Sequence, residues 1–248
     1  MKRITLLLFA LSLKTVLFAQ VDTIDTKTNK LLIHNLPEGA ATYVVYFVDS
    51  ATNEITGPSD IWVRTTQYST FHNADAIQFD WKWYHHDSLY KTVRDICRKN
   101  DMAPLYAYGN SVRTGIRAYN FTDGYMVAAD TVAGNNADAS KKVALTVPVY
   151  NWEWDMELFS TLPYKKVGQQ FEIAFLDPND NKPAYYLHTV IGTDELAVNK
   201  QAKIKCWILR VGYSATAYAD FWISQQSHEM LKMKGYYNGR YRYKVKLY

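Results

Sequence analysis

Residues 76–85, AIQFDWKWYH, decide the fold class of this 248-residue chain. Large apolar side chains alternate here with mostly polar ones: Ile77, Phe79, Trp81 and Trp83 against Gln78, Asp80, Lys82 and Tyr84. A period of two places the apolar set on one face of a β-strand, whereas a helix would scatter it around the axis. The stretch therefore predicts a strand with one apolar face.

Similar short stretches recur along the chain, separated by turn signals such as Thr122-Asp123-Gly124. They predict strands at 43–49, 60–66, 104–109, 115–121, 125–130, 169–176, 184–191, 203–211, 218–225, 229–236 and 240–247. An aromatic content of 15%, with 20 tyrosines, also favours a sheet-rich protein. Many short, closely spaced strands indicate a mainly β protein with one antiparallel sheet, curled or closed.

The segment 151–164, NWEWDMELFSTLPY, departs from this pattern. On a helix, Trp152, Met156 and Phe159 line one side and Trp154, Leu158 and Leu162 another, with Pro163 ending the run. A helix that is apolar around most of its circumference is expected to be enclosed. Residues 88–98, SLYKTVRDICR, also have apolar side chains at helical spacing, so periodicity alone favours a helix there.

The stretch 133–142, AGNNADASKK, is small and polar and predicts an exposed loop. Strands on both sides of it share the same aromatic character, so we expect a single β-rich domain over residues 20–248. Cys97 and Cys206 are the only cysteines. Either one long-range disulfide or two buried thiols fits them.

The N-terminus has the order of a secretory signal peptide: Lys2 and Arg3, an apolar run from Ile4 to Leu13, and Ala19 before Gln20. We expect cleavage near Ala19, loss of residues 1–19 and a soluble, exported, periplasmic protein, because the run is shorter than the roughly 20 residues that span a bilayer. Removal of Lys2, Arg3 and Lys14 lowers the formal charge from +4 to +1. A near-neutral chain without a binding motif argues against a nucleic-acid partner.

Three carboxylates, Glu153, Asp155 and Glu157, are the best candidates for acid–base chemistry, which would make the protein a hydrolase. Glu153 and Glu157 lie one helical turn apart on a single segment, so we instead expect them at a solvated edge. The six histidines lack metal-ligand spacing, and no nucleophile or phosphate-loop motif is present. We therefore expect no catalytic residue, no metal and no cofactor.

The last two predicted strands carry six cations: Lys232, Lys234, Arg240, Arg242, Lys244 and Lys246. A tight Asn238-Gly239 hairpin would set Met233 opposite Lys244 and mix the two faces. A bulge at Gly235 would realign Leu231 and Met233 with Val245 and Tyr243, and would gather all six cations on one surface. That surface is either a solvated edge that resists aggregation or a contact for anionic lipid or an acidic partner.

Read together, several segments resemble an exported bacterial family known as a domain of unknown function: FDWKWYHHDSLYKTVRDICRKNDMAPLY, NWEWDMELFSTLPY, FEIAFLDPN, CWIL and FWISQQSHEMLKMKGYYNGRYRYKVKL. Phe221 to Ser224 and Leu162 to Tyr164 match its packing and turn motifs. The layout is similar to that of the periplasmic lipoprotein-carrier superfamily, and the resemblance covers roughly residues 75–248. It implies a strongly curved antiparallel sheet, a half-open barrel, wrapped around one or two helices. It also implies that 88–98 is a strand.

On this architecture we expect noncatalytic binding of a lipid or other amphiphile in the concavity of the sheet, where large apolar side chains line or close a cavity. The expected ligand-binding residues are Trp81, Trp83, Trp152, Trp154, Phe159, Trp207, Phe221 and Trp222. The same residues could instead fill a solid interior. The alternative function is that of a structural or assembly protein of the cell envelope, which would dock a membrane surface or an envelope protein through its cationic C-terminal hairpin.

Overall fold

The computed structural model describes residues 21–248. The expected signal peptide, residues 1–19, lies outside the described residues. No helix within the described part is long and apolar enough to cross a membrane.

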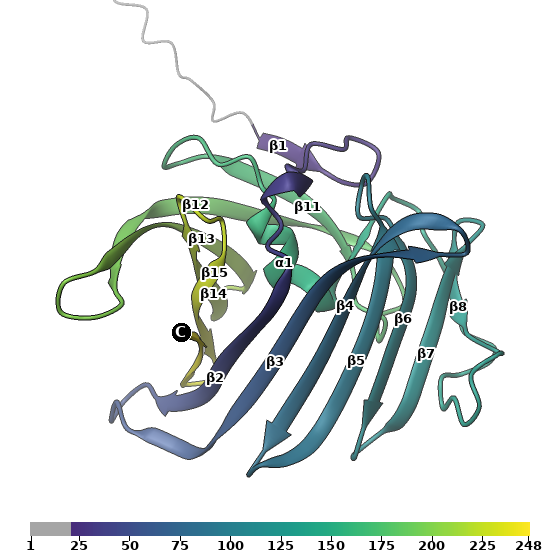
Figure 1. Cartoon of the computed structure of the whole chain (residues 1–248), viewed down its shortest axis with the longest axis horizontal. Coiled ribbons are helices and arrows are strands. Elements are labelled where there is room, and N and C mark those ends of the chain that lie inside the picture. The colour runs from purple at the N-terminus through teal and green to yellow at the C-terminus, as the bar shows by residue number, and fades with distance from the viewer. Residues whose placement is uncertain (1–20) are drawn as a thin grey trace, which may run out of the picture.

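The protein is built on one 16-stranded sheet (Figure 1). Its strands are β1 (Val21–Ile24), β2 (Gly39–Asp49), β3 (Ile55–Phe71), β4 (Ala74–His85), β5 (Ser88–Arg98), β6 (Pro104–Ser111), β7 (Gly115–Thr122), β8 (Tyr125–Ala128), β9 (Lys142–Ala144), β10 (Tyr150–Asn151), β11 (Gln170–Leu176), β12 (Ala184–Ala197), β13 (Lys203–Ser214), β14 (Ala217–Ser224), β15 (Met230–Tyr237) and β16 (Arg240–Leu247). The helical segments are the 3-10 turns η1 (Ile33–Asn35) and η2 (Trp152–Trp154) and the helix α1 (Asp155–Ser160).

Neighbouring strands follow the order β1-β11-β12-β13-β14-β15-β16-β2-β3-β4-β5-β6-β7-β8-β9, with β10 beside β11. All pairs are antiparallel except β1 and β10 against β11. The last strand, β16, pairs with β2. This pairing joins the C-terminal strands β11 to β16 and the N-terminal strands β2 to β9 into one sheet. The strands curve around α1 in an open wrap, since β1 and β9 end the strand order without pairing with each other (Figure 1). The predicted mainly β fold, a single curved sheet around a helix, is confirmed.

Tight two-residue turns set the register of four hairpins. His72-Asn73 joins β3 to β4, His86-Asp87 joins β4 to β5, Asp123-Gly124 joins β7 to β8, and Asn238-Gly239 joins β15 to β16, each with positive φ at both residues. This conformation matches the right-handed twist of the paired strands. The first of these turns aligns Trp62 with Trp83, and the last aligns Met233 with Lys244.

Residues 88–98 form the strand β5, as the family resemblance implied and against the helical periodicity. The strand pairs along its length with both β4 and β6. As a strand, the segment is hydrogen-bonded on two sides and buries Val93, Asp95 and Cys97. These interactions outweigh the helical spacing of its apolar residues, because a short isolated helix is unstable.

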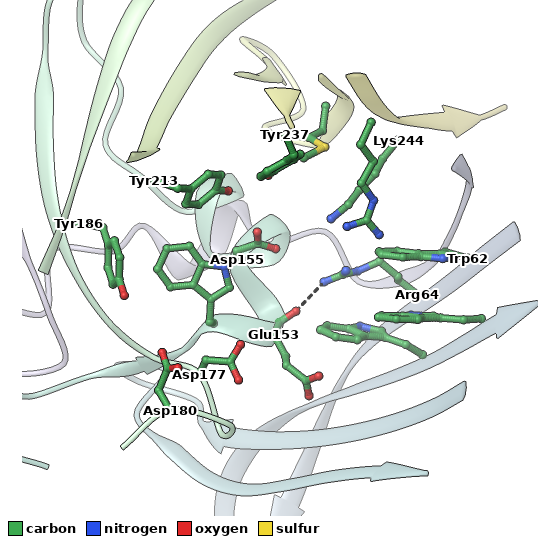
Figure 2. A pocket seen from close by; sticks show the side chains of 15 residues that line it. Trp62, Arg64, Glu153, Asp155, Asp177, Asp180, Tyr186, Tyr213, Tyr237 and Lys244 are labelled. Atoms are coloured by element: carbon green, nitrogen blue, oxygen red, sulfur yellow. Dashed lines mark hydrogen bonds between the residues drawn. The ribbon is translucent and has the colours of Figure 1, made fainter. Parts of the chain in front are cut away.

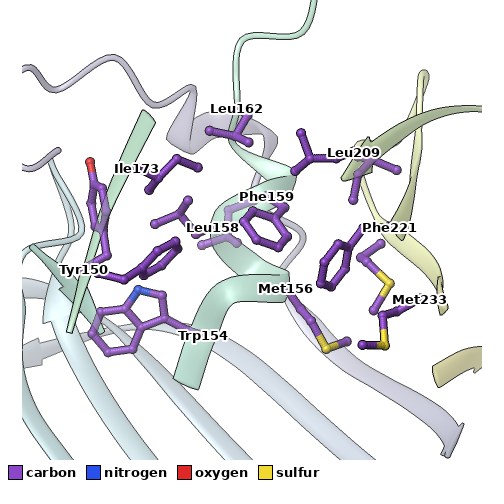
Figure 3. Packing of buried hydrophobic residues seen from close by; sticks show 14 of the residues in the cluster. Tyr150, Trp154, Met156, Leu158, Phe159, Leu162, Ile173, Leu209, Phe221 and Met233 are labelled. Atoms are coloured by element: carbon purple, nitrogen blue, oxygen red, sulfur yellow. The ribbon is translucent and has the colours of Figure 1, made fainter. Parts of the chain in front are cut away.

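The segment 151–162 lies inside the concavity, as predicted (Figure 3). All six residues of α1 are buried, and Phe159 packs edge-on against Phe221 with ring centroids 4.8 Å apart. Trp154 is fully buried beside Phe79, and Leu158 and Leu162 are also fully buried. The interior around α1 is therefore solidly packed.

Side-chain and backbone hydrogen bonds fix both ends of this buried segment. The Asn151 side chain accepts from the backbone N–H of Glu153 at 3.0 Å and begins the 3-10 turn. At the other end, the Tyr164 hydroxyl donates to Phe159 O at 3.0 Å, and Thr161 O accepts from Leu32 N at 2.7 Å. Because terminal helix groups buried without partners are costly, these bonds allow so short a helix to lie in the core.

The bulge expected at Gly235 is wrong. Strands β15 and β16 pair without interruption from Tyr237 opposite Arg240 to Lys232 opposite Val245. The irregularity lies on the other side of β15, where Trp222 and Ile223 pair with Lys232 and Met230 and Leu231 is passed over. The tight Asn238-Gly239 turn therefore sets the register, and the cationic side of β16 shares a face with Met233.

Both cysteines are buried free thiols. Cys97 belongs to the core around α1, whereas Cys206 lies in a separate cluster with Trp222 and Leu231. Of the two alternatives left open by the sequence, the structure has the thiols.

Candidate functional site

A cavity of about 660 Å³ opens on the concave side of the sheet, beside the packed helix (Figure 2). One wall is aromatic: Trp62 of β3 and Trp83 of β4 stack with centroids 4.1 Å apart and planes 3° apart. Trp152 faces them from η2 and packs edge-on against Tyr186 of β12, at 4.4 Å. Charged side chains from β3, β16, η2, α1 and the β11–β12 loop also line the cavity: Arg64, Glu153, Asp155, Asp177, Asp180, Arg242 and Lys244.

A second cavity, of about 250 Å³, adjoins the first under β5, β6 and β7. The two cavities share Trp83 and Glu153 as lining residues. At this junction the Lys91 ammonium lies 2.8 Å from a Glu153 carboxylate oxygen and 4.4 Å from the Trp83 ring centroid. Together the cavities follow the concave face from β16 to β7.

A buried ion pair ties the helix to the sheet at the floor of the larger cavity. Arg64 Nε donates to Glu157 Oε1 at 2.7 Å, and Arg64 Nη2 donates to Glu157 Oε2. The same nitrogen donates to Glu153 O at 3.3 Å (Figure 2), and the guanidinium lies 3.7 Å from the Trp81 ring centroid. Burial alone would lower the pKa of Arg64, but the Glu157 carboxylate reverses that effect and the pKa is raised. Glu157 therefore holds a permanently charged guanidinium in the core.

Two further cations, Arg242 and Lys244, reach the cavity from alternate positions of β16. They lie 4.9 and 4.8 Å from the Trp62 ring centroid. Neither forms an ion pair with a carboxylate among residues 21–248, and the Lys244 ammonium has only Met156 Sδ within hydrogen-bonding reach, at 3.5 Å. Burial lowers the pKa of Lys244 to about 7, and Asp155 only partly offsets that effect. Burial also lowers the pKa of Arg242.

Asp155 is the acid that faces these two cations. It is 8% exposed, and its Oδ1 accepts a hydrogen bond from the backbone N–H of the neighbouring Met156 at 2.7 Å. Burial raises the pKa of Asp155, against the opposing influence of Lys244 and Arg64. The cavity thus holds two cations and one carboxylate that are close in space but not joined by a direct salt bridge.

Several buried donors in the cavity lining have no acceptor within the described chain. They are the indole N–H groups of Trp62, Trp81 and Trp83 and the Nε–H of Arg242. Buried polar groups in native proteins are nearly always hydrogen-bonded, and each exception requires an explanation. The wall formed by these tryptophans and Arg242 therefore has more unpaired hydrogen-bond donors than unpaired acceptors.

Comparison with family models matches residues 42–246 to the family described as "Protein of unknown function (DUF3108)". The chain belongs to this DUF3108 family. No curated protein matches the chain. Among solved structures, it is similar to the "Beta-barrel-like Protein of Domain of Unknown Function DUF1849 from Brucella abortus", with 9% sequence identity and a TM-score of 0.49 over 85% of this chain and 97% of that one.

In this DUF3108 chain the eight aromatic residues predicted to bind ligand divide into three groups. Trp81, Trp83 and Trp152 line the cavity. Trp154, Phe159 and Phe221 belong to the solid core, and Trp207 packs against that core and stacks on Tyr164 at 6.2 Å. Trp222 lies on the opposite, convex face, where its indole donates to Asp194 at 2.8 Å. Its placement in the concavity was wrong, because consecutive residues of a strand point to opposite faces and Phe221 takes the inner one.

The six cations predicted to share one surface do not do so. Arg242 and Lys244 face the concave cavity, whereas Lys232 and Lys234 lie against aromatic rings of the convex face, 4.6 Å from Trp222 and 4.0 Å from Tyr241. Lys246 pairs with Glu229, and Arg240 is exposed beside the hairpin turn. The single cationic face was therefore wrong, because it depended on the absent bulge.

The solvated edge expected for the three carboxylates is also wrong. Asp155 and Glu157 are buried at 8% and 9% exposure, and Glu153 is paired with Lys91. No group of three or more metal-ligating side chains occurs within residues 21–248.

Sequence reasoning missed Trp62, Arg64, Lys91 and Tyr186 as cavity residues. A signal for the first two was present, because the His72-Asn73 turn sets Trp62 opposite Trp83 and Arg64 opposite Trp81. No local signal could place Tyr186, which lies on β12 beside β11 and reaches the cavity by packing against Trp152 of the distant η2 segment at 4.4 Å.

Proposed function

We propose that this protein binds an amphiphile, without catalysis, in the cavity on the concave side of its sheet. The observation that carries the proposal is an aromatic-walled cavity of about 660 Å³ beside a core that is otherwise solid. Small-molecule sites commonly have volumes of roughly 300–1,000 Å³ and combine apolar walls with a few polar groups.

The lining suits a ligand with two kinds of surface. The stacked Trp62 and Trp83 and the opposing Trp152 offer broad apolar faces to a hydrocarbon or ring. Arg242, Lys244 and Asp155 offer charges to a polar head group at one end. The adjoining cavity beyond Trp83 extends the space available to a longer chain.

Ligand entry in this proposal leaves the helix in place. The helix α1 is locked by apolar packing and by the Arg64–Glu157 pair, whereas the cavity lies beside it. Displacement of residues 151–162 is therefore not part of the proposed mechanism. We locate the binding event in the periplasm on the strength of the N-terminal sequence, Lys2 and Arg3 followed by an apolar run.

Titration with the neutral hydrophobic dye N-phenyl-1-naphthylamine tests the proposal. We expect saturable binding at one site, weakened at least fivefold by Trp83→Ala, which removes one partner of the indole stack. Tyr241→Ala is the matched control, since Tyr241 belongs to the aromatic cluster that packs with Lys234 on the convex face. Absence of saturable binding, or equal loss in both variants while circular dichroism shows both folded, would contradict an amphiphile site in this cavity.

Docking through the C-terminal hairpin is a second candidate. The observation in its favour is a mixed surface on the convex face, where Lys232 and Lys234 lie over Trp222 and Tyr241. Aromatic and cationic side chains together suit an anionic membrane surface. Cosedimentation with phosphatidylglycerol vesicles at low salt should show binding that Lys232→Gln/Lys234→Gln abolishes; no cosedimentation of the wild type would dispose of this candidate.

A further inference from the structure

Lys244 occupies one end of the larger cavity, and Asp177 and Asp180 lie across it on the β11–β12 loop (Figure 2). Arg242 belongs to the same end, because it and Lys244 both lie within 5 Å of the Trp62 ring centroid, at 4.9 and 4.8 Å. The cavity therefore has a cationic end and an acidic end. A charged ligand entering it experiences opposite potentials at the two ends, which fixes its orientation.

The charges at the cationic end leave one positive charge uncompensated. Arg64 is neutralised by Glu157, and Lys91 by Glu153. Among the carboxylates at this end of the lining, Arg242 and Lys244 then face Asp155; Asp60, which also acts on Arg242, lies outside the lining and contacts His85 at 2.6 Å. When Lys244 is protonated, two cations of the lining oppose one carboxylate of the lining at this end.

The same end of the cavity also has hydrogen-bond donors that lack acceptors. The Arg242 Nε–H and the Trp62 indole N–H are buried donors without an acceptor, and Lys244 is only 6% exposed with no oxygen partner. A buried cation without a counter-ion is costly, so an anionic oxygen group supplied from outside would meet an unsatisfied site rather than replace an existing bond.

We propose that this end of the cavity binds the singly charged anionic head group of the amphiphile, a carboxylate or a phosphodiester, with Arg242 and Lys244 as its charged donors. The proposal rests on the proposed function and specifies the ligand class for the same cavity. A single negative charge is the one that the surplus cation neutralises; the Trp62–Trp83 stack then receives the apolar part next to the head group.

Binding of such a head group must be linked to the protonation of Lys244. The charged groups that act on the Lys244 ammonium are Asp155 and Glu157 of α1, Arg64 of β3 and Arg242 of β16. Since the pKa of Lys244 is lowered to about 7, its charge is lost progressively above neutrality. A bound anion favours the protonated form, so affinity for the anion falls as pH rises above 7.

Isothermal titration with probes that share one decyl chain tests this assignment: decanoate, methyl decyl phosphate, decyl maltoside and decyltrimethylammonium, all below their micelle-forming concentrations. At pH 6.5 we expect at least one of the two anions to bind tenfold or more tightly than the neutral and cationic probes. The tighter of the two anions identifies the head-group chemistry. Equal affinity for all four probes would overturn the head-group assignment and leave the proposed function standing, whereas no binding of any probe would overturn both.

Substitutions separate the anion site from the cavity as a whole. Arg242→Gln should weaken the anionic probe about tenfold and leave decyl maltoside unchanged, and Lys244→Met should abolish the decline in anion affinity between pH 6.5 and 8.5. Lys234→Gln, on the convex face, is the control and should alter neither. Equal weakening of anionic and neutral probes by Arg242→Gln, or an unaltered pH profile in Lys244→Met, would refute the assignment.

Discussion

At the scale of single residues, the interior of this protein contains more ionisable groups than a packed core usually holds. Asp95, Asp155, Glu157, Arg64, His188 and Lys244 are all less than a tenth exposed. Only Arg64 and Glu157 form a close mutual ion pair among them. The others shift toward their neutral forms: burial raises the pKa of Asp95 and Asp155 and lowers that of His188 and Lys244. Their stability contributions therefore depend on pH.

Lys244 should make the protein more stable as pH rises from 7 to 9. Its pKa is lowered from 10.5 to about 7 in the fold, so the unfolded chain binds more protons across this window and stability rises with pH. Relative to Lys244→Met, the wild type should gain about 2 kcal/mol in unfolding free energy between pH 7 and 9. Urea denaturation of both proteins at the two pH values measures this difference; a constant difference would contradict a buried, titrating lysine.

His188 should make the protein sensitive to acid. Its Nδ1–H donates to Tyr186 O at 2.9 Å while Phe159 packs 5.2 Å away, and burial lowers its pKa from 6.5 to about 4. Protonation in this range favours the unfolded chain, so stability is lost as pH falls from 6.5 to 4. Relative to His188→Gln, the wild type should lose about 3 kcal/mol between pH 7 and 4. Parallel denaturation curves at every pH would show that His188 does not titrate in this way.

At the scale of elements, the protein depends on a six-residue helix that could not exist alone. The helix is stabilised by its apolar circumference and by the bonds at both ends. The helix in turn fills the concavity, so that the inner face of the curved sheet packs against it. The cavity forms where this packing stops, between the helix and the Trp62–Trp83 stack.

Phe159→Ala should be strongly destabilising, because it deletes a ring that contacts Phe221, Phe175 and His188 in the fully buried core. We expect a loss of about 3–5 kcal/mol in unfolding free energy. Val167→Ala, at a site 51% exposed just beyond the helix, is the matched control and should change stability by less than about 0.5 kcal/mol. Comparable losses in the two variants, measured by denaturant titration, would contradict an enclosed helix.

Glu157→Met should cost about 3–5 kcal/mol, since it leaves the Arg64 guanidinium buried without its counter-ion. The double variant Arg64→Met/Glu157→Met should recover most of that loss, because it removes both charges. A double-mutant cycle by denaturant titration measures the coupling. Additive losses would mean that the pair does not connect the helix to β3.

Periodicity predicted most strands because their inner and outer faces differ in polarity, as AIQFDWKWYH does. It shortened β3 to 60–66 where the structure has Ile55–Phe71, since neither end of that strand contains a fully buried side chain. It missed β1, whose four residues pair in parallel with the distant β11. Periodicity misplaced the cations of β16, because no local feature of that strand shows that Asp155 and the Trp62–Trp83 stack lie close to Lys244 in the fold.

At the scale of the whole molecule, the sheet encloses two different spaces. The one around α1 is filled by side chains of the chain itself, as a solid interior would be, and the one beside it is an open cavity with aromatic and charged walls. Of the two alternatives that the sequence left open, the filled core is present around α1, and an open cavity lies beside it under the same concave face. The amphiphile proposal concerns only the second space.

Organic extraction and mass spectrometry of the folded protein, purified from cells that express the full chain, test the central proposal most directly. We predict that an amphiphile is recovered at close to one molecule per chain, and that folded Trp83→Ala yields markedly less. Repeated recovery of wild-type protein with no organic ligand, from preparations that also fail to bind N-phenyl-1-naphthylamine, would contradict the account.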